Sequence, residues 1–295
     1  MEMEVFIPKL GCREDSIGMR VAQLKRQRFA LKSVVFRLIC LRKAGGSLST
    51  QIIYVGLTMQ TNRRIWQSMD EVLKAANEGD AAAQTYLGIC FQTGQGVKQD
   101  YNEAVRWFRR AAEQNDASAQ CYLGFCYQTG SGVPQEFGQA AKWFREAAEQ
   151  GDPAAQFNLG VLYETGQGVT QNYAEAVKWY TSAAEQGEPQ AQFNLGVFYE
   201  TGQVVPQDYE EAVKWYRKAA EQECAPAQCN LGLCYETGRG VEQNVREAVK
   251  WFCRAARQGD KTAQHNLGVY YASLEAAEKA TTEEGAEQTA GDAVV

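Results

Sequence analysis

Hydrophobic side chains recur along most of the chain with the spacing of paired amphipathic helices. Ala83, Leu87 and Phe91 are four residues apart, so they share one face of an α-helix. About twenty residues later, Ala104 and Phe108 repeat this spacing, with charged residues on the opposite side. A short glycine-containing segment separates the two stretches. The pattern predicts two helices joined by a loop, here called helix A and helix B.

The whole pattern repeats every 36 residues, which is typical of a tandem array. Each helix A contains a glutamine, at Gln84, Gln120, Gln156, Gln192, Gln228 and Gln264. A Leu-Gly pair follows three residues after each of these glutamines, and helix B carries a tryptophan at Trp107, Trp143, Trp179, Trp215 and Trp251. We expect the tryptophans to pack between units, or alternatively to form an aromatic ladder facing a ligand.

The expected ends of the helices also carry recognisable residues. Gly94 and its equivalents can adopt the left-handed conformation that ends helix A. Asp100 and Glu103 form a capping-box pattern at the start of helix B. The same pattern begins at Asn172, Asp208 and Asn244, whereas Glu136 is a poorer cap, and Val204 replaces a loop glycine. These signals predict five complete A–B pairs between about residues 80 and 258.

The phrase that begins at Ala155, A-Q-F-N-L-G-V-L-Y-E-T-G-Q-G-V, and its later copies resemble the Sel-one-like repeat, a branch of the tetratricopeptide superfamily. The resemblance covers about residues 65–275. It implies antiparallel helix pairs stacked into a right-handed superhelix, whose concave inner surface holds protein partners. It does not imply any particular partner.

We therefore predict an all-α fold, a right-handed α-solenoid of stacked antiparallel helix pairs with a 36-residue repeat. The solenoid is expected to span residues 65–280. It would contain a lone helix B at 65–77, five full pairs, and a lone helix A from residue 261 onward, as expected for the terminal units of an array. Residues 281–295 are rich in Ala, Glu, Thr and Gly and lack aromatics, so we expect a disordered tail.

Residues 1–64 have a different composition, with 12 Lys and Arg against 4 Asp and Glu. We expect this basic N-terminal segment to be disordered or targeting-like, or to lie upstream of a true start at Met59 or Met69. An additional helical cap is a further alternative. Residues 19–43 fit a basic amphipathic helix, a composition that suits a mitochondrial presequence or contact with a membrane surface.

Charge and residue content exclude several classes of function. The net charge of −6 argues against nucleic-acid binding, because the phosphate backbone supplies most of such affinity. No apolar run approaches the roughly 18 residues of a spanning helix, so we expect no stable transmembrane insertion. His265 is the single histidine, and the Gly-x-Gly segments follow helices rather than strands. We predict no catalytic residue, no metal site and no cofactor.

The nine cysteines accompany no clear secretory signal, so we expect an intracellular protein with mostly reduced thiols. Cys121 and Cys126 are five residues apart on one helix, a separation that does not allow a disulfide. Cys90, Cys126 and Cys234 share a core column. Cys224 is expected in a turn and is the best candidate for an exposed thiol.

Candidate partner-binding residues lie in three variable columns of helix A. Amides that either hydrogen-bond an extended peptide or serve local structure are Asn158, Asn194, Asn230 and Asn266. Aromatic rings that either form an exposed apolar patch or pack on a neighbouring helix are Phe157 and Phe193. Carboxylates that either favour a basic partner or belong to a solvated face are Glu164, Glu200 and Glu236.

The predicted function is that of a non-catalytic adaptor or scaffold, which binds a protein or extended peptide on the concave face. We expect it to be a monomer and cytoplasmic, with mitochondrial or membrane-associated placement through the basic N-terminus as the alternative. The alternative function is an organellar assembly factor with a thiol- or cofactor-dependent role.

Overall fold

The computed structural model describes residues 68–273. The helices are α2 (Met69–Asn77), α3 (Ala81–Thr93), α4 (Tyr101–Ala112), α5 (Ala117–Thr129), α6 (Phe137–Glu149), α7 (Pro153–Thr165), α8 (Tyr173–Glu185), α9 (Pro189–Thr201), α10 (Tyr209–Glu221), α11 (Ala225–Thr237) and α12 (Val245–Arg257). Residues 261–273 are also helical. The predictions for residues 1–64 and 281–295 lie outside the described residues.

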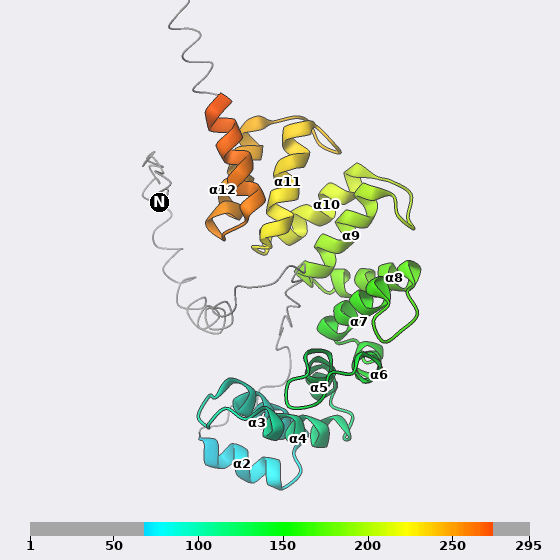
Figure 1. Cartoon of the computed structure of the whole chain (residues 1–295), viewed down its shortest axis with the longest axis vertical. Helices are drawn as coiled ribbons and strands as arrows, with labels where there is room; N and C mark the ends of the chain where they lie inside the picture. The colour runs from blue at the N-terminus through cyan, green and yellow to red at the C-terminus, as the bar shows by residue number, and fades with distance from the viewer. Residues whose placement is uncertain (1–67, 274–295) are drawn as a thin grey trace, which may run out of the picture. The chain divides into compact units, whose positions relative to one another are not determined.

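Consecutive helices pack against one another along the whole described part of the chain. Each helix from α3 to α11 contacts the helix before it and the helix after it, and Figure 1 shows the hairpins following one another in chain order. The odd-numbered helices α3 to α11 are helices A, and the even-numbered helices are helices B. The all-α solenoid prediction is confirmed, and α2 takes the place of the predicted lone helix B.

An aromatic ring of each full-repeat helix B lies against the Leu-Gly glycine of the helix A before it. A Cβ atom on Gly196 would lie 2.6 Å from the ring of Tyr216, and one on Gly124 would lie 2.8 Å from the ring of Phe144. These rings are fully buried. The glycine is therefore needed for the close approach of the two helices, since any larger residue would overpack the contact.

The glutamine column links successive repeats through its side-chain amides. Gln192 Nε2 donates to the carbonyl of Ala184, at the end of the preceding helix B, at 3.0 Å. Its Oε1 accepts from Gln222 Nε2, at the end of the next helix B, at 2.9 Å. The same pair of contacts is made by Gln84, Gln120, Gln156 and Gln228. A buried amide satisfied on both sides explains why glutamine recurs at this position.

The start of helix B is capped as predicted, but on one side only. Asp100 Oδ1 accepts hydrogen bonds from the backbone N–H groups of Asn102 and Glu103. The predicted reciprocal bond, from the Asp100 N–H to the side chain of Glu103, is wrong, because the Asp100 N–H donates to the carbonyl of Phe91. The side chain of Glu103 instead pairs with Arg106 at 2.6 Å. The predicted weak cap, Glu136, makes no side-chain cap hydrogen bond.

The loop between helix A and helix B needs two residues with positive φ. Gly94 and Gly96 have φ values of 76° and 75°. Val204 occupies the second of these positions with φ 72°, and its side chain is 52% exposed. The loop at Val204 thus keeps the glycine geometry with a β-branched residue, which is strained in this region.

The tryptophans pack between units, as the first interpretation of this column predicted. Trp143 of α6 packs against the core cluster formed by α4 and α5. Trp215 of α10 belongs to the cluster that contains Tyr180 and Leu195. The Nζ atom of Lys218 lies 3.8 Å from the ring centroid of Trp215.

Candidate functional site

Buried tyrosines of helix B join residues from two successive A helices. The hydroxyl of Tyr180 donates to Glu164 Oε2 at 2.5 Å, and the side chain of Asn194 in the next repeat bonds the same hydroxyl. Tyr216 donates to Glu200 Oε2 at 2.5 Å in the same way, and Asn230 is its second partner. Each Glu–Tyr–Asn set therefore connects a carboxylate of one unit to an amide of the next.

The hydroxyls in these sets remain protonated donors under ordinary conditions. Burial raises the pKa of Tyr180 well above its usual value, and the nearby Glu164 carboxylate raises it further. Burial and Glu200 raise the pKa of Tyr216 for the same reasons. The hydrogen bond from a neutral phenol to a carboxylate is strong because the acceptor is charged. These contacts therefore fix the register between the helices.

Two of the predicted partner-binding residues are not accessible. Asn158 is 0% exposed, and its Nδ2 donates to the carbonyl of Ala154 at 2.8 Å. Phe157 is 5% exposed, and its ring centroid lies 5.8 Å from that of Tyr180. The expectation that Phe157 belongs to an exposed apolar patch is wrong, because its ring fills space beside the tyrosine of the following helix B.

The equivalent residues in later repeats are half-buried. Phe193 packs beside Tyr216 with a centroid distance of 5.9 Å. Asn194, Asn230 and Asn266 retain part of their surface. The structure thus places Asn194 and Asn230 in the structural role left open from the sequence, while leaving room for an additional contact with a partner.

The three predicted carboxylates are not equivalent. Glu164 and Glu200 are half-buried and accept the tyrosine hydroxyls, whereas Glu236 is exposed. The corresponding helix-B residue is Phe252, which carries no hydroxyl. Within residues 68–273, the Glu236 carboxylate has no hydrogen bond or ion pair, so it is the most available of the three.

The same helix-B column lacks a hydroxyl at three positions, Phe108, Phe144 and Phe252, and two of these leave buried polar atoms without a partner. Phe252 separates Glu236 from Asn266, whose buried Nδ2 atom has no partner among the described residues. Phe144 takes the equivalent place between Gln128 and Asn158. Both side-chain amide atoms of Gln128 and Oδ1 of Asn158 are buried without a partner in the described part of the chain. A tyrosine hydroxyl would satisfy some of these atoms.

A second column, which the sequence analysis missed, caps the helices A. Asp80, Asp116 and Asp152 each accept a backbone N–H three residues later. In the next two repeats Glu188 and Cys224 occupy this position and make no side-chain cap hydrogen bond. The missed signal was visible in the sequence, because these residues recur every 36 positions.

The cap column also contacts the preceding repeat. Thr85 Oγ1 donates to Asp116 Oδ1 at 3.1 Å, and Cys121 hydrogen-bonds Asp152. Cys229 hydrogen-bonds Asp260 in the same manner. Two junctions between full repeats lack this contact. There a phenylalanine takes the place of the hydroxyl or thiol donor, and the cap residue is not aspartate. The corresponding pairs at these junctions are Phe157 with Glu188, and Phe193 with Cys224.

Glu188 is a buried carboxylate without a full set of partners. It is 3% exposed, and its Oε1 atom has no partner among the described residues. Burial raises its pKa to about 7, and the nearby Asp152 carboxylate contributes in the same direction, against a backbone N–H from Gln190 that lowers it. The pKa of Glu188 therefore lies close to neutral pH because its carboxylate is buried.

Within residues 68–273, six of the seven cysteines are buried, and Cys253 is half-buried. Cys224 is 9% exposed, so the expectation of an exposed thiol is wrong; it belongs to the cap column and not to the preceding glycine turn. Burial raises its pKa. Burial also raises the pKa of Cys126 and of Cys229 to about 12. Raised thiol pKa values reduce the thiolate needed for nucleophilic chemistry or metal binding.

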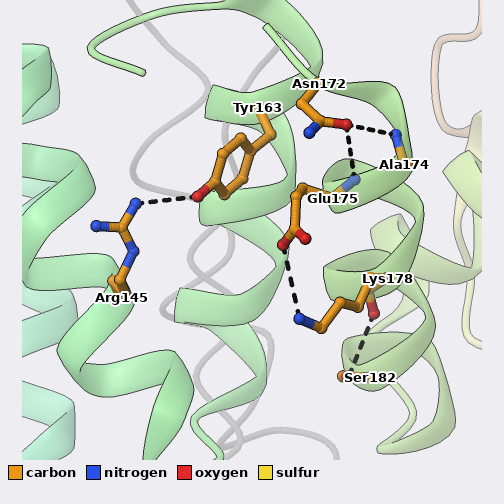
Figure 2. A network of polar contacts seen from close by, with 7 residues as sticks. All are labelled: Arg145, Tyr163, Asn172, Ala174, Glu175, Lys178 and Ser182. Carbon is orange, nitrogen blue, oxygen red and sulfur yellow. Dashed lines mark hydrogen bonds and ion pairs between the residues drawn. The ribbon is translucent and has the colours of Figure 1, made fainter. Parts of the chain in front are cut away.

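A polar cleft lies between helix α6 and the following repeat, beside the network of polar contacts in Figure 2. Arg145 Nη2 donates to the hydroxyl of Tyr163 at 3.0 Å. The cleft has a volume of about 580 Å³ and is lined by Arg145, Tyr163, residues 169–172 and Glu175. Asn172 caps helix α8 beside it by accepting from the N–H groups of Ala174 and Glu175.

Residues 68–273 show no group of three or more His, Cys, Asp or Glu side chains placed to hold a metal ion. In that same part of the chain, no helix combines the length and apolar character needed to cross a bilayer.

Comparison with known proteins agrees with this architecture. The family model described as the Sel1 repeat matches residues 81–116, 117–152, 153–188, 189–224 and 225–260. None of the curated proteins compared with the chain matches it.

Two solved structures are similar in both sequence and fold. A protective antigen of uropathogenic Escherichia coli strains, which displays an SLR fold, has 38% identity and a TM-score of 0.64, over 68% of this chain and 43% of that one. A Sel1 repeat protein from Oxalobacter formigenes has 35% identity and a TM-score of 0.62, over 66% of this chain and 78% of that one. The chain thus spans less than half of the first relative. With five matched repeats and helices that follow their period, this chain belongs to the Sel1 repeat family.

Proposed function

We propose that this chain is a non-catalytic scaffold that binds a basic protein segment or extended peptide along its A helices. Sel1 repeat proteins are generally protein-interaction scaffolds, which gives the broad function. The basic character of the partner, and the residues that contact it, are specific to this proposal.

The charge of the A helices carries the proposal. Helices α3, α5, α7, α9 and α11 contain no lysine and no arginine. Three of them carry a carboxylate at the same position, at Glu164, Glu200 and Glu236. A series of carboxylates without neighbouring cations on the same helices favours lysine or arginine side chains of a partner.

The contributions of the individual residues follow from their surroundings. Glu236 is exposed and has no described partner, so it offers a full ion pair. Glu200 is half-buried and already accepts from Tyr216 through Oε2, so it adds charge and has less acceptor capacity left than Glu236. Phe193, Asn230 and their equivalents Asn194 and Asn266 retain partial exposure beside these carboxylates. Phe157 and Asn158 support the neighbouring helices instead of contacting the partner.

A non-catalytic role, a monomeric state and a cytoplasmic location complete the proposal. The single histidine, His265, belongs to no group of three or more potential metal ligands among residues 68–273. The buried thiols give no support to a thiol-dependent assembly factor. The scaffold interpretation therefore accounts for the described residues without requiring reactive chemistry.

Affinity capture from the source cell, with the full chain as bait, tests the proposal. Wild type is expected to retain a partner at near-stoichiometric level, and Glu236→Lys to lose it because the substitution reverses the charge at the binding face. Glu210→Lys is the matched control, since Glu210 is an exposed carboxylate on helix B. Retention by Glu236→Lys equal to that by Glu210→Lys would exclude the A helices as the binding face.

A further inference from the structure

Arginines of three B helices pair with tyrosines of the following repeat. Arg145 Nη2 donates to Tyr163 at 3.0 Å, and the equivalent Arg109 donates to Tyr127 at 3.0 Å. The third pair, Arg217 with Tyr235, has a distance of 2.9 Å. Two of these pairs are in adjacent repeats, whereas the repeats on either side of the third have Thr181 and Cys253 instead of arginine.

The hydrogen bond leaves both members of each pair as donors. The tyrosine oxygen accepts from the guanidinium, so its own O–H can still donate to a second acceptor. The guanidinium has five N–H groups and commits one of them to the tyrosine, and it stays charged at all ordinary pH values. Two kinds of donor therefore converge on one place, which suits an oxyanion with several acceptor positions.

The cleft beside Arg145 has room for such a group. Its volume of about 580 Å³ is bounded by Tyr163, by Thr170 and the residues that follow it, and by Glu175. Glu175 is the carboxylate of this cleft. Figure 2 shows it paired with Lys178, whose Nζ lies 3.7 Å from Glu175 Oε2. Among residues 68–273, Arg145 thus has no ion pair.

Helix α4, in the preceding repeat, carries further arginines. A second hollow, of about 310 Å³, is lined by Arg106, Arg109, Arg110 and Glu113. Helix α4 contains three arginines against one glutamate, Glu103. Trp143 of α6 packs on the cluster formed by α4 and α5, so the two B helices belong to one packed unit. We call the exposed side of α4 and α6 around Arg109 and Arg145 the basic face.

We propose that the basic face binds an acidic segment of a partner protein, with side-chain carboxylates placed on the Arg109–Tyr127 and Arg145–Tyr163 pairs. This site is separate from the proposed A-helix site, and it has the opposite charge. The chain as a whole carries a charge of −6, so long-range attraction does not bring an acidic segment to it. Affinity for such a segment therefore depends on these local contacts.

The test uses the full chain and a fluorescein-labelled peptide of twelve alternating glutamates and serines, followed by fluorescence anisotropy at low salt. A peptide with glutamine in place of glutamate is the neutral comparison. Wild type is expected to bind the acidic peptide at least about tenfold more tightly than the neutral one, because two charge-assisted pairs are formed. Equal binding of the two peptides would overturn the proposal.

Substitutions in the two adjacent pairs test the location. Arg109→Gln combined with Arg145→Gln is expected to lower affinity for the acidic peptide about tenfold or more. Arg217→Gln removes the isolated pair and is expected to change affinity less than about twofold, since a single surface ion pair contributes little. An equal loss in both variants would show non-specific attraction and would contradict the assignment.

A gain of binding gives an independent test. Thr181→Arg creates a third consecutive arginine, opposite Tyr199 of the next repeat, and is expected to tighten binding of the acidic peptide about threefold. Unchanged melting temperatures establish that these surface variants remain folded. Tighter binding of a phosphorylated peptide or of single-stranded DNA through the same arginines would replace the carboxylate partner and refute this proposal. Glu236→Lys leaves the acidic-peptide affinity unweakened, which separates this site from the A-helix site.

Discussion

Removing the hydroxyl of Tyr216 is expected to destabilise the solenoid by about 2 kcal/mol, because a hydrogen bond to a charged group contributes about 1.5–3 kcal/mol. The side chain is fully buried, and its hydroxyl bonds both Glu200 and Asn230. Tyr216→Phe keeps the ring that lies on Gly196, as Phe144 does in another repeat. The change therefore isolates the hydroxyl from the packing of the core.

The size of the loss lies near the middle of this range for a structural reason. Glu200 is half-buried and can regain water when the hydroxyl is removed, whereas Asn230 loses a contact between repeats. For a domain of about 200 residues, 2 kcal/mol corresponds to a fall in Tm of roughly 4–8 °C. Urea unfolding followed by circular dichroism, with a thermal melt beside it, measures both quantities.

The reverse substitution at another repeat is the matched control. Phe252→Tyr introduces a hydroxyl between Glu236 and the unpartnered Nδ2 of Asn266, and we expect it to stabilise the protein by about 1 kcal/mol. In a Glu200→Gln background, Tyr216→Phe should lower the free energy of unfolding by less than it does in wild type, because the charged acceptor is already absent. Equal stability of wild type and Tyr216→Phe, within error, would refute the role assigned to the hydroxyl.

Three further outcomes follow from other features of the chain. Val204→Gly should raise the free energy of unfolding by about 1 kcal/mol in urea titration, because it relieves a left-handed β-branched residue, and Val204→Ala should gain less. Glu188 has a folded-state pKa of about 7, above its usual 4.5, so the folded state binds the proton more tightly. The contribution of Glu188 to the free energy of unfolding should consequently fall by about 3 kcal/mol as pH rises from 4.5 to 7. Glu188→Gln should flatten that dependence, and equal stabilities of variant and wild type at pH 8 would contradict it. In native protein at pH 8, Cys224 should resist alkylation by iodoacetamide and react only in urea, as mapped by mass spectrometry; rapid native labelling would show that the thiol is exposed.

Sequence periodicity was sufficient to predict the helix pairs, because the residues that form them have identical roles in each copy. The glycine of each Leu-Gly pair and the glutamine of helix A recur without exception, and their contacts recur in the five full repeats. Accessibility was harder to predict. Phe157 and Phe193 occupy the same column, yet Phe157 is buried and Phe193 is half-buried, since exposure depends on the neighbouring repeats rather than on the local pattern.

Some errors came from contacts between repeats that helical periodicity does not reveal. Cys224 was assigned to a turn, although the aspartates at the equivalent positions show that it begins a helix. The link from Glu164 through Tyr180 to Asn194 also spans three helices. Its residue types were visible, but the register that brings them together depends on how helix B packs on two A helices.

The contacts at the cap column make the order of the repeats chemically specific. Thr85 and Cys121 each present a donor to an aspartate of the next repeat, whereas Phe193 precedes a repeat that begins with Cys224. Exchanging units would place a phenylalanine against an aspartate, or a thiol against a cysteine. Although each unit has the same length and helices, the repeats are therefore not interchangeable modules. Duplication or deletion of a unit would require a compensating change at the new junction.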